Sequence, residues 1–287
     1  MTRTPFTLMR PVAQTTAVVF ASPHSGRDYS PDFLARAALD ERSIRSSEDA
    51  FVDLLFDSAP DHGAPLLVGG APRAFVDLNR APDELDPALI DGIRRATHSP
   101  RIANGLGVIP RVVANGRPIY EGRITLAEAE DRITRFWRPY HDSLQTLLDT
   151  TRADFGEAIL IDCHSMPHEA LESLASGNSG RPDVVLGDRF GAAAGAAVVD
   201  RVEAAFRDAG LRVARNIPFA GAYVTQHYGR PSRRCHAIQI EIDRALYMDE
   251  ATIQPGPGFH AFRALIAGVI AAIAEIGRPE QLRVAAE

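Results

Sequence analysis

Four consecutive side chains near residue 163 could carry chemistry. The segment AILIDCHSMP (158–167) places Asp162, Cys163, His164 and Ser165 after a short apolar run typical of a buried strand. Successive side chains of a strand point to opposite faces, so Asp162 and His164 should share one face, with Cys163 packed on the other. This alternation argues against a cysteine nucleophile, and the chain has no G-x-S-x-G motif to activate the serine. The pattern instead favours His164 as a metal ligand whose ring N–H donates to Asp162.

Other chemically capable residues follow or end other apolar runs. They are His24 after 16–21, Asn79 and Arg80 after 74–78, and Glu241 in 236–242. Each of them alone is more typical of a capping or solvated group. In open α/β sheets, however, ligands bind just beyond the carboxyl ends of the strands, so this fold would gather the residues at one edge.

The residue types suit a catalytic zinc site, which keeps three protein ligands and one open position for water. His24, His164 and one acid of the neighbouring pair 48–49 could supply the ligands. Glu241 would then be an unbound carboxylate that takes a proton from the attacking water, and the isoleucines beside it would raise its pKa. The alternative for Glu241 is a strand-end acid paired with an arginine.

The elements that must position these residues alternate between strands and helices. Predicted strands lie at 16–21, 65–69, 74–78, 158–163, 183–187 and 236–242, and predicted helices at 49–59, 125–151, 190–209 and 258–276. Thr125, followed by Glu128, is typical of a helix N-terminus. The alternation predicts an α/β fold with a mixed, largely parallel sheet between helices, and we expect a single catalytic domain over 1–287.

The composition is that of a soluble globular protein. The chain has 287 residues, of which 45% are hydrophobic, and a net charge of −6, which does not favour nucleic acid or an anionic membrane as partner. Two cysteines without a C-x-x-C pair, and an N-terminus without an apolar leader, fit the cytoplasm. The apolar stretch 259–277 contains charged residues, and we expect a buried or amphipathic helix there rather than a membrane span.

Seven segments together resemble the N-formylglutamate amidohydrolase family over almost the full length of the chain. They are SPHSGRDY (22–29), EDAFVDLLF (48–56), FVDLNRAPDELD (75–86), WRPYH (137–141), LIDCHSMP (160–167), PFAGAYVTQHYG (218–229) and HAIQIEI (236–242). The resemblance implies a three-layer α/β/α fold, similar to zinc carboxypeptidases and aspartoacylase-like hydrolases. It also implies one Zn²⁺ per chain, or another divalent transition metal, and hydrolysis of N-formyl-L-glutamate to formate and L-glutamate in histidine breakdown.

The resemblance further implies a role for individual residues. The metal ligands would be His24, His164 and Asp49, which fits the family pattern better than Glu48, and Glu241 would be the base. Asn79 and Arg80 would grip a substrate carboxylate, and Arg73 would stabilise the oxyanion.

Two more residues are candidates for substrate binding. The substrate has two carboxylates, for which planar arginine side chains are suited, so Arg123 could bind one of them. His227 could donate a hydrogen bond to the substrate or move a proton. The alternatives are a surface salt bridge for Arg123 and a loop histidine bound to backbone for His227.

The sequence is also compatible with two other functions. The chain has Gly221-Ala222 and Phe51 where some relatives have Gly-Gly and His, which leaves the exact N-acyl substrate open. A zinc amidase or carboxypeptidase-like hydrolase acting on another N-acyl amino acid or a peptide would use the same residues. A metal-free carboxylate-binding protein would use only the arginines.

Overall fold

Two compact units make up the chain. The computed structural model describes residues 4–93, 99–113, 116–174 and 180–279. The first unit comprises Met1–Thr7, Pro23–Ala50 and Val68–Ser143, and the second Leu8–Ser22, Phe51–Leu67 and Leu144–Glu287. The expected single domain over 1–287 concerns both units together and stays a prediction.

A seven-stranded sheet forms the centre of the second unit, with parts of β1 and β3 belonging to the first. The strand order is β1-β3-β2-β6-β9-β7-β8. The strands are β1 (Phe6–Met9), β2 (Val18–Ser22), β3 (Leu66–Gly69), β6 (Ala158–Met166), β7 (Val184–Gly187), β8 (Val213–Arg215) and β9 (Cys235–Asp243). The pairs β2–β6, β6–β9 and β7–β8 are parallel, whereas β7 and β9 pair antiparallel. The predicted mixed, largely parallel sheet is therefore confirmed.

The two longest strands, β6 and β9, pair in register over their full nine residues. All side chains of β6 are buried, which requires a nearly continuous apolar run because both faces of a central parallel strand are covered. In β6 the first four residues are apolar and polar side chains begin at Asp162; further along, His164 is the partner of Glu241 on β9.

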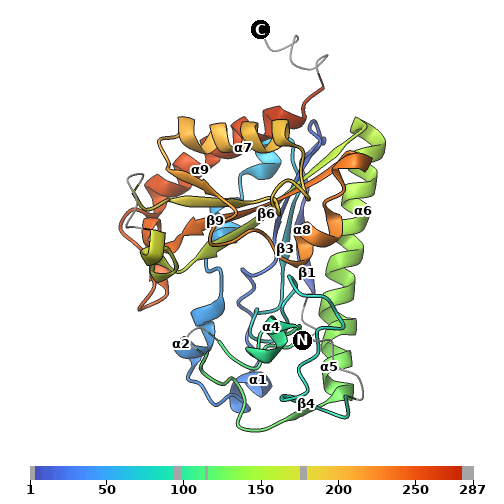
Figure 1. Ribbon diagram of the computed structural model, residues 1–287, viewed down its shortest axis with the longest axis vertical. Coiled ribbons are helices and arrows are strands. Elements are labelled where there is room, and N and C mark those ends of the chain that lie inside the picture. Colours follow the sequence, from blue (N-terminus) through green and yellow to red (C-terminus); the bar gives the residue numbers. More distant parts are fainter. Residues whose placement is uncertain (1–3, 94–98, 114–115, 175–179, 280–287) are drawn as a thin grey trace. The chain divides into compact units, whose positions relative to one another are not determined.

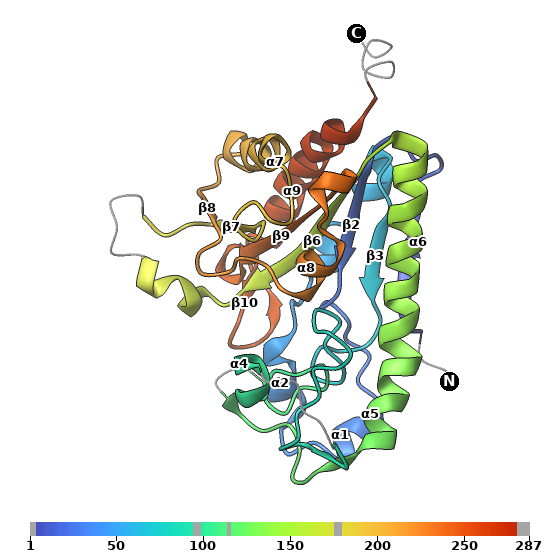
Figure 2. The same cartoon turned by 45° about the vertical axis from the view of Figure 1, so that its right-hand side comes forward.

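Helices cover both faces of this sheet (Figures 1 and 2). α7 and α9 pack together on one face, and α8 packs against β6 and β9 on the other. The helices of the second unit are α3 (Val52–Leu55), α7 (Ala196–Asp208), α8 (Tyr223–Tyr228), α9 (Phe259–Ala274) and the larger part of α6 (Arg138–Phe155). Its short 3-10 turns are Ala59–His62, His168–Leu174, Pro231–Arg233, Arg244–Leu246 and Glu275–Gly277, and β10 (Met248–Asp249) pairs with β11 (Gln254–Pro255).

The C-terminal helix is the one described segment long and apolar enough to cross a membrane, Phe259–Gly277. Its apolar character has a structural reason within the second unit. Seven of its side chains are buried, among them Phe262, Ile266 and Ile270, and the helix packs against α3 and α7. These contacts are those of a core helix, as expected from the sequence.

The first unit contains little regular structure. Its elements are α1 (Pro31–Ala35), α2 (Glu41–Ile44), the 3-10 turn Arg45–Ser47, α4 (Pro100–Ala103), α5 (Leu126–Arg132), the π-helical segment Ile133–Trp137, the start of α6, and the parallel pair β4 (Ile90–Asp91) and β5 (Ile124–Thr125). Thr125 caps α5 by accepting a bond from the backbone N–H of Glu128, as the sequence predicts.

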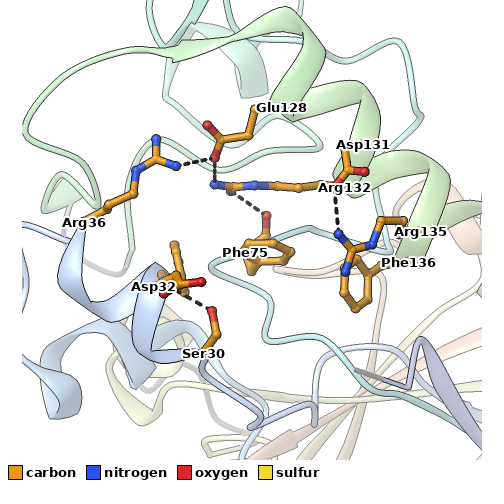
Figure 3. Close-up of a pocket in the computed structure, with 10 residues that line it drawn as sticks. Ser30, Asp32, Arg36, Phe75, Glu128, Asp131, Arg132, Arg135 and Phe136 are labelled. Carbon is orange, nitrogen blue, oxygen red and sulfur yellow. Dashed lines mark hydrogen bonds and ion pairs between the residues drawn. The ribbon is translucent and has the colours of Figure 1, made fainter. Parts of the chain in front are cut away.

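A buried guanidinium holds this irregular unit together (Figure 3). The side chain of Arg132 is 3% exposed and donates to the backbone oxygen of Phe75 at 3.1 Å, to the Tyr120 hydroxyl at 2.5 Å and to the Glu128 carboxylate at 2.5 Å. Its guanidinium carbon lies 4.1 Å from the centre of the Phe75 ring, a cation–π contact. Arg132 thus links α5 to a loop more than 50 residues earlier in the chain.

The same guanidinium lines a surface pocket of about 470 Å³ in the first unit (Figure 3). Arg36 shares Glu128 with Arg132, and Arg135 pairs with Asp131. Each arginine of the pocket therefore has a carboxylate partner. We interpret this network as structural support rather than as an anion site.

Five of the six predicted strands are confirmed: 16–21, 65–69, 158–163, 183–187 and 236–242 correspond to β2, β3, β6, β7 and β9. The strand predicted at 74–78 is wrong, because the backbone N–H groups of Phe75 and Val76 turn back to the oxygen of Pro72. The apolar side chains Val76 and Leu78 are buried as a strand would bury them, but in a loop.

Two predicted helices are shorter than expected. The helix at 49–59 is reduced to α3 because Phe51 has a left-handed backbone (φ 66°), which ends the helix on its N-terminal side. The helix at 190–209 starts at Ala196, after Arg189 and Phe190 with φ 55° each. The helix at 125–151 is confirmed as α5, the π-helical segment and α6.

Replacing Arg132 by methionine tests the network. Arg132→Met should lower the free energy of unfolding by about 2–4 kcal/mol in urea denaturation, because the partly buried Glu128 carboxylate keeps only Arg36 as partner and two further acceptors lose their donor. Arg135→Met is the matched control: its side chain is 57% exposed and paired with exposed Asp131, so the change should stay within about 1 kcal/mol. Equal effects of the two substitutions would contradict the role given to Arg132.

Candidate active site

The polar centre of the first unit is the buried carboxylate of Asp77. Its Oδ1 accepts from Nε2 of His24 at 2.7 Å and from the backbone N–H of Asn79 at 2.8 Å, and its Oδ2 accepts from Nε of Arg73 at 3.1 Å. Burial favours the neutral acid, but the charges of His24, Arg80 and Arg73 outweigh it and keep the pKa of Asp77 well below its ordinary value. Asp77 is therefore an ionised acceptor that fixes three neighbours.

His24 is oriented by this bond. Because Nε2 donates to Asp77, the ring nitrogen left to bind a metal is Nδ1, which faces Oδ2 of Asp49 at 3.3 Å. Two ligands of one tetrahedral zinc ion, each about 2.0–2.2 Å from it, lie about 3.3–3.5 Å apart. The His24–Asp49 spacing matches that distance.

Backbone bonds bring His24 and Asp49 together from segments about two dozen residues apart. The Asp49 N–H donates to the His24 oxygen at 3.1 Å, and the Ser25 hydroxyl donates to the Asp49 oxygen at 3.2 Å. Next to them, Gly26 lies so close to another loop that a Cβ would come within 2.2 Å of the Ala71 oxygen. This close approach explains why the SPHSG segment ends in glycine.

The choice between the two neighbouring acids has a geometric answer in the first unit. Glu48 is bound in a bidentate manner by Arg45, at 3.0 and 3.1 Å, whereas Asp49 points at the imidazole of His24. The geometry thus favours Asp49 as the acid of the site.

The Asn79–Arg80 turn is held on both sides. Arg80 is 6% exposed, its Nε donates to the Leu106 oxygen at 2.9 Å, and its Nη1 donates to the Asn79 oxygen at 2.7 Å, which leaves Nη2 outside both bonds. Burial lowers the pKa of Arg80 from its ordinary value.

Two residues of the WRPYH segment bind the backbone of the same turn. Nε1 of Trp137 donates to the Arg80 oxygen at 2.9 Å, and Nε2 of His141 donates to the Leu78 oxygen at 2.9 Å. The π-helical segment ends at Trp137, and such segments occur often at functional sites. The WRPYH segment therefore positions the Asn79–Arg80 turn.

In the second unit, His164 is oriented in the same way as His24. Its Nε2 lies 3.0 Å from Oδ2 of Asp162, two residues earlier on β6, which confirms the predicted pairing and leaves Nδ1 as the ring nitrogen that could bind a metal. Cys163 is fully buried, and burial raises the pKa of its thiol well above the ordinary value, so it is not a nucleophile. The Ser165 hydroxyl accepts from Nε of Arg244 at 3.1 Å.

Glu241 shares its face of β9 with polar neighbours, contrary to expectation. Ile240 and Ile242, which we expected to surround it, are fully buried but point to the opposite face, because side chains alternate along a strand. The neighbour on its own face is Gln239, whose Nε2 donates to Oε1 of Glu241 at 2.8 Å.

His24, Asp49 and His164 make up a group of buried side chains that could hold a metal ion. Two imidazoles and one carboxylate are a donor set of catalytic zinc sites. Both rings have their Nε2 bound to a carboxylate, as metal-ligating histidines usually do. The residues present therefore fit the implied metal.

The remaining sequence candidates lie in ordinary surroundings. Arg123 is 48% exposed, pairs with Asp91 at 3.0 Å and donates to two backbone oxygens, which favours the alternative of a surface salt bridge. His227 lies on α8, its ring stacks on Tyr223 with centroids 5.0 Å apart, and its pKa is lowered by partial burial and by Arg230. Their roles in substrate binding stay predictions.

Two residues that orient candidate site residues were not predicted from the sequence: Asp77, which binds His24, and Gln239, which binds Glu241. Asp77 lies in the quoted FVDLNR segment, but no local signal says that it meets His24. Gln239 had a signal, because it is two residues before Glu241 on a predicted strand and therefore on the same face.

Comparison with known proteins agrees with this fold. The N-formylglutamate amidohydrolase family matches residues 16–248. The N-formylglutamate deformylase of Pseudomonas aeruginosa is 32% identical over 236 residues, covering 81% of this chain and 82% of the relative, and that of Pseudomonas putida is 31% identical over the same shares. The crystal structure of N-formylglutamate amidohydrolase from Ralstonia eutropha has a TM-score of 0.89 and 35% identity, covering 96% of this chain and 99% of that one.

The mixed α/β fold and these matches define the chain as a hydrolase that acts on an amide bond. It belongs to the N-formylglutamate amidohydrolase family. A gene product of Agrobacterium tumefaciens, with a TM-score of 0.62 and 16% identity, shares the fold.

The bond between Asp77 and His24 can be tested by metal affinity. Asp77→Asn should weaken Zn²⁺ binding by about 10–100-fold in chelator competition, because His24 loses the carboxylate that orients it. Asp86→Asn is the matched control, since Asp86 is equally buried in the first unit but binds Arg111 and the backbone of Ala88. An equal loss of affinity in both variants would show that Asp77 has no specific effect on His24.

Proposed function

We propose that this protein is a zinc-dependent amidohydrolase that converts N-formyl-L-glutamate and water to formate and L-glutamate. The observation that carries the proposal is the buried His24–Asp49–His164 donor set in a chain whose curated relatives are named N-formylglutamate deformylase. The proposal includes both units as one catalytic domain, because His24 and Asp49 belong to the first and His164 to the second.

His24, Asp49 and His164 hold the metal, with Nδ1 as the ligand atom of each ring. Bound zinc would supply a Lewis acid for the formyl carbonyl and an activated water. The carboxylates of Asp77 and Asp162 behind the rings fix the ring orientation and the tautomer in which Nδ1 can bind the metal. Another divalent transition metal would suit the same donors.

Glu241 is the general base. It accepts a proton from the attacking water as the oxygen bonds to the formyl carbon, and it delivers this proton to the amide nitrogen as the C–N bond breaks. The products are formate and the free amine of L-glutamate. The burial of Glu241 and its place beside the strand residue His164 support this role.

The substrate is bound through its charges. Asn79 and Arg80 bind a carboxylate through the side-chain amide and through Nη2 of the guanidinium, whose Nε and Nη1 hold the backbone. Arg73, which Asp77 holds through Nε, stabilises the negative oxygen that forms on the formyl group. His227 is a further candidate for a hydrogen bond to the substrate. The enzyme works in the cytoplasm, in histidine breakdown.

Substrate preference tests the proposal directly. The purified protein should release formate from N-formyl-L-glutamate with a kcat/KM at least about 100-fold above that for N-acetyl-L-glutamate or N-formyl-L-leucine. N-acetyl-L-glutamate has an additional methyl group at the reacting carbonyl, and N-formyl-L-leucine lacks the side-chain carboxylate. Released amine and formate are measured separately. Preference for an N-acetyl or peptide substrate would replace this function by that of an amidase or peptidase.

Metal removal tests the donor set. Protein purified with zinc should carry about one ion per chain by mass spectrometry of the metal, lose activity on chelation and regain it on zinc addition. His164→Ala should carry none. His168→Ala is the control, because His168 lies four residues further along and is bound to Asp243 at 2.7 Å. Parental zinc content in His164→Ala would remove that residue from the site, and activity without metal would favour a different mechanism.

A further inference from the structure

Gln239 lies beside the proposed base in the second unit. It is two residues before Glu241 on β9, on the same face, and the two residues are 4% and 8% exposed. Nε2 of Gln239 donates to Oε1 of Glu241 at 2.8 Å. A buried amide that binds a buried carboxylate has a strong electrostatic effect on it, because little water competes.

The orientation of the Gln239 amide is decided by a backbone donor on its other side. The N–H of Ala222 donates to Oε1 of Gln239 at 3.2 Å. If the amide were reversed, its NH₂ group would face this N–H and its oxygen would face the carboxylate of Glu241, so both bonds would be lost. Only one orientation satisfies both neighbours, and in it Gln239 is a donor to Glu241.

The backbone donor is itself fixed by packing. Ala222 directly precedes α8, and its oxygen accepts from the Thr225 hydroxyl at 3.0 Å. The segment before it lies against β7 at Gly187, where a Cβ would come within 2.7 Å of the Ala220 carbonyl carbon. Glycine at this position allows the close approach. Gln239 is therefore anchored to a closely packed backbone and not to a mobile side chain.

We propose that Gln239 is a positioning residue for the reaction. It binds one carboxylate oxygen of Glu241 and thereby fixes the orientation in which this carboxylate takes a proton from the attacking water. This inference rests on the proposed function, in which Glu241 is the base. A base must lie within hydrogen-bond reach of the proton that it abstracts, and a displacement of about 1 Å can cost about 100-fold in rate. Gln239 also joins two segments of the chain, 218–229 and 236–242, because it binds Ala222 of the first and Glu241 of the second.

Gln239→Met tests the inference, because methionine keeps the length of the side chain and removes both hydrogen bonds. We expect kcat for N-formyl-L-glutamate to fall by about 10–100-fold, with KM within about 3-fold of the parent value. Zinc content should stay at the parent level, since no proposed ligand is changed. A kcat within about 2-fold of the parent would overturn the inference.

Thr225→Val distinguishes a direct effect of Gln239 on Glu241 from an effect on the stability of the turn at Ala222. It removes the hydroxyl bond to the Ala222 oxygen but leaves the Gln239–Glu241 bond in place. We expect its kcat to stay within about 3-fold of the parent. If Thr225→Val lost as much activity as Gln239→Met, Gln239 would act only through the stability of the turn, and the inference would be wrong.

Two further variants distinguish a failure of this inference from a folding defect and from a failure of the proposed function. If circular dichroism shows that Gln239→Met does not fold, Gln239→Asn carries the test with the same expected loss, because its amide is one methylene too short to reach both Ala222 and Glu241. Glu241→Gln should lower kcat by about 100–10,000-fold. A parental rate in Glu241→Gln, or no hydrolysis of N-formyl-L-glutamate by the parent, would contradict the proposed function. A parental rate in Gln239→Met alone would contradict only the inference.

Discussion

The burial of one carboxylate governs the arrangement of the first unit. An ion taken out of water costs several kcal/mol unless its oxygens are hydrogen-bonded and its charge is paired. Asp77 meets this requirement with an imidazole, a guanidinium and a backbone N–H. Because these three partners must converge on two oxygens, His24, Arg73 and Asn79 have little freedom to lie elsewhere. The ring orientation that suits metal binding is thus a consequence of satisfying a buried charge.

The second unit reaches a similar result by a different route. There the regular spacing of parallel strands does the positioning: Asp162 and His164 share a face of β6, and Gln239 and Glu241 share a face of β9. Each of the two candidate side chains, His164 and Glu241, has a neighbour two residues earlier that binds it, at 3.0 Å in one case and 2.8 Å in the other. Strand alternation therefore gives the second unit an arrangement that the loops of the first unit must build from individual hydrogen bonds.

Much of the second unit could be predicted because its signals are local. Apolar runs of strand length located β2, β3, β6, β7 and β9, and alternation placed Cys163 in the core, away from Asp162 and His164. The same rule, applied to HAIQIEI, would have identified Gln239. Ile240 and Ile242, the direct neighbours of Glu241, face the other way. The segment 74–78 misled for a different reason: its alternating apolar residues are buried, but its backbone bonds are those of a turn.

The sequence by itself determined the kinds of donors and their local neighbours: histidines and acids at strand ends, and the pairing of Asp162 with His164. Only the tertiary structure decided that Glu48 binds Arg45 while Asp49 faces His24, and that Asp77 rather than another acid holds that histidine. His24 and Asp77 are 53 residues apart and joined by loops with no repeating pattern. The pairing of such groups depends on how distant segments pack and bury their charges, which no local periodicity encodes.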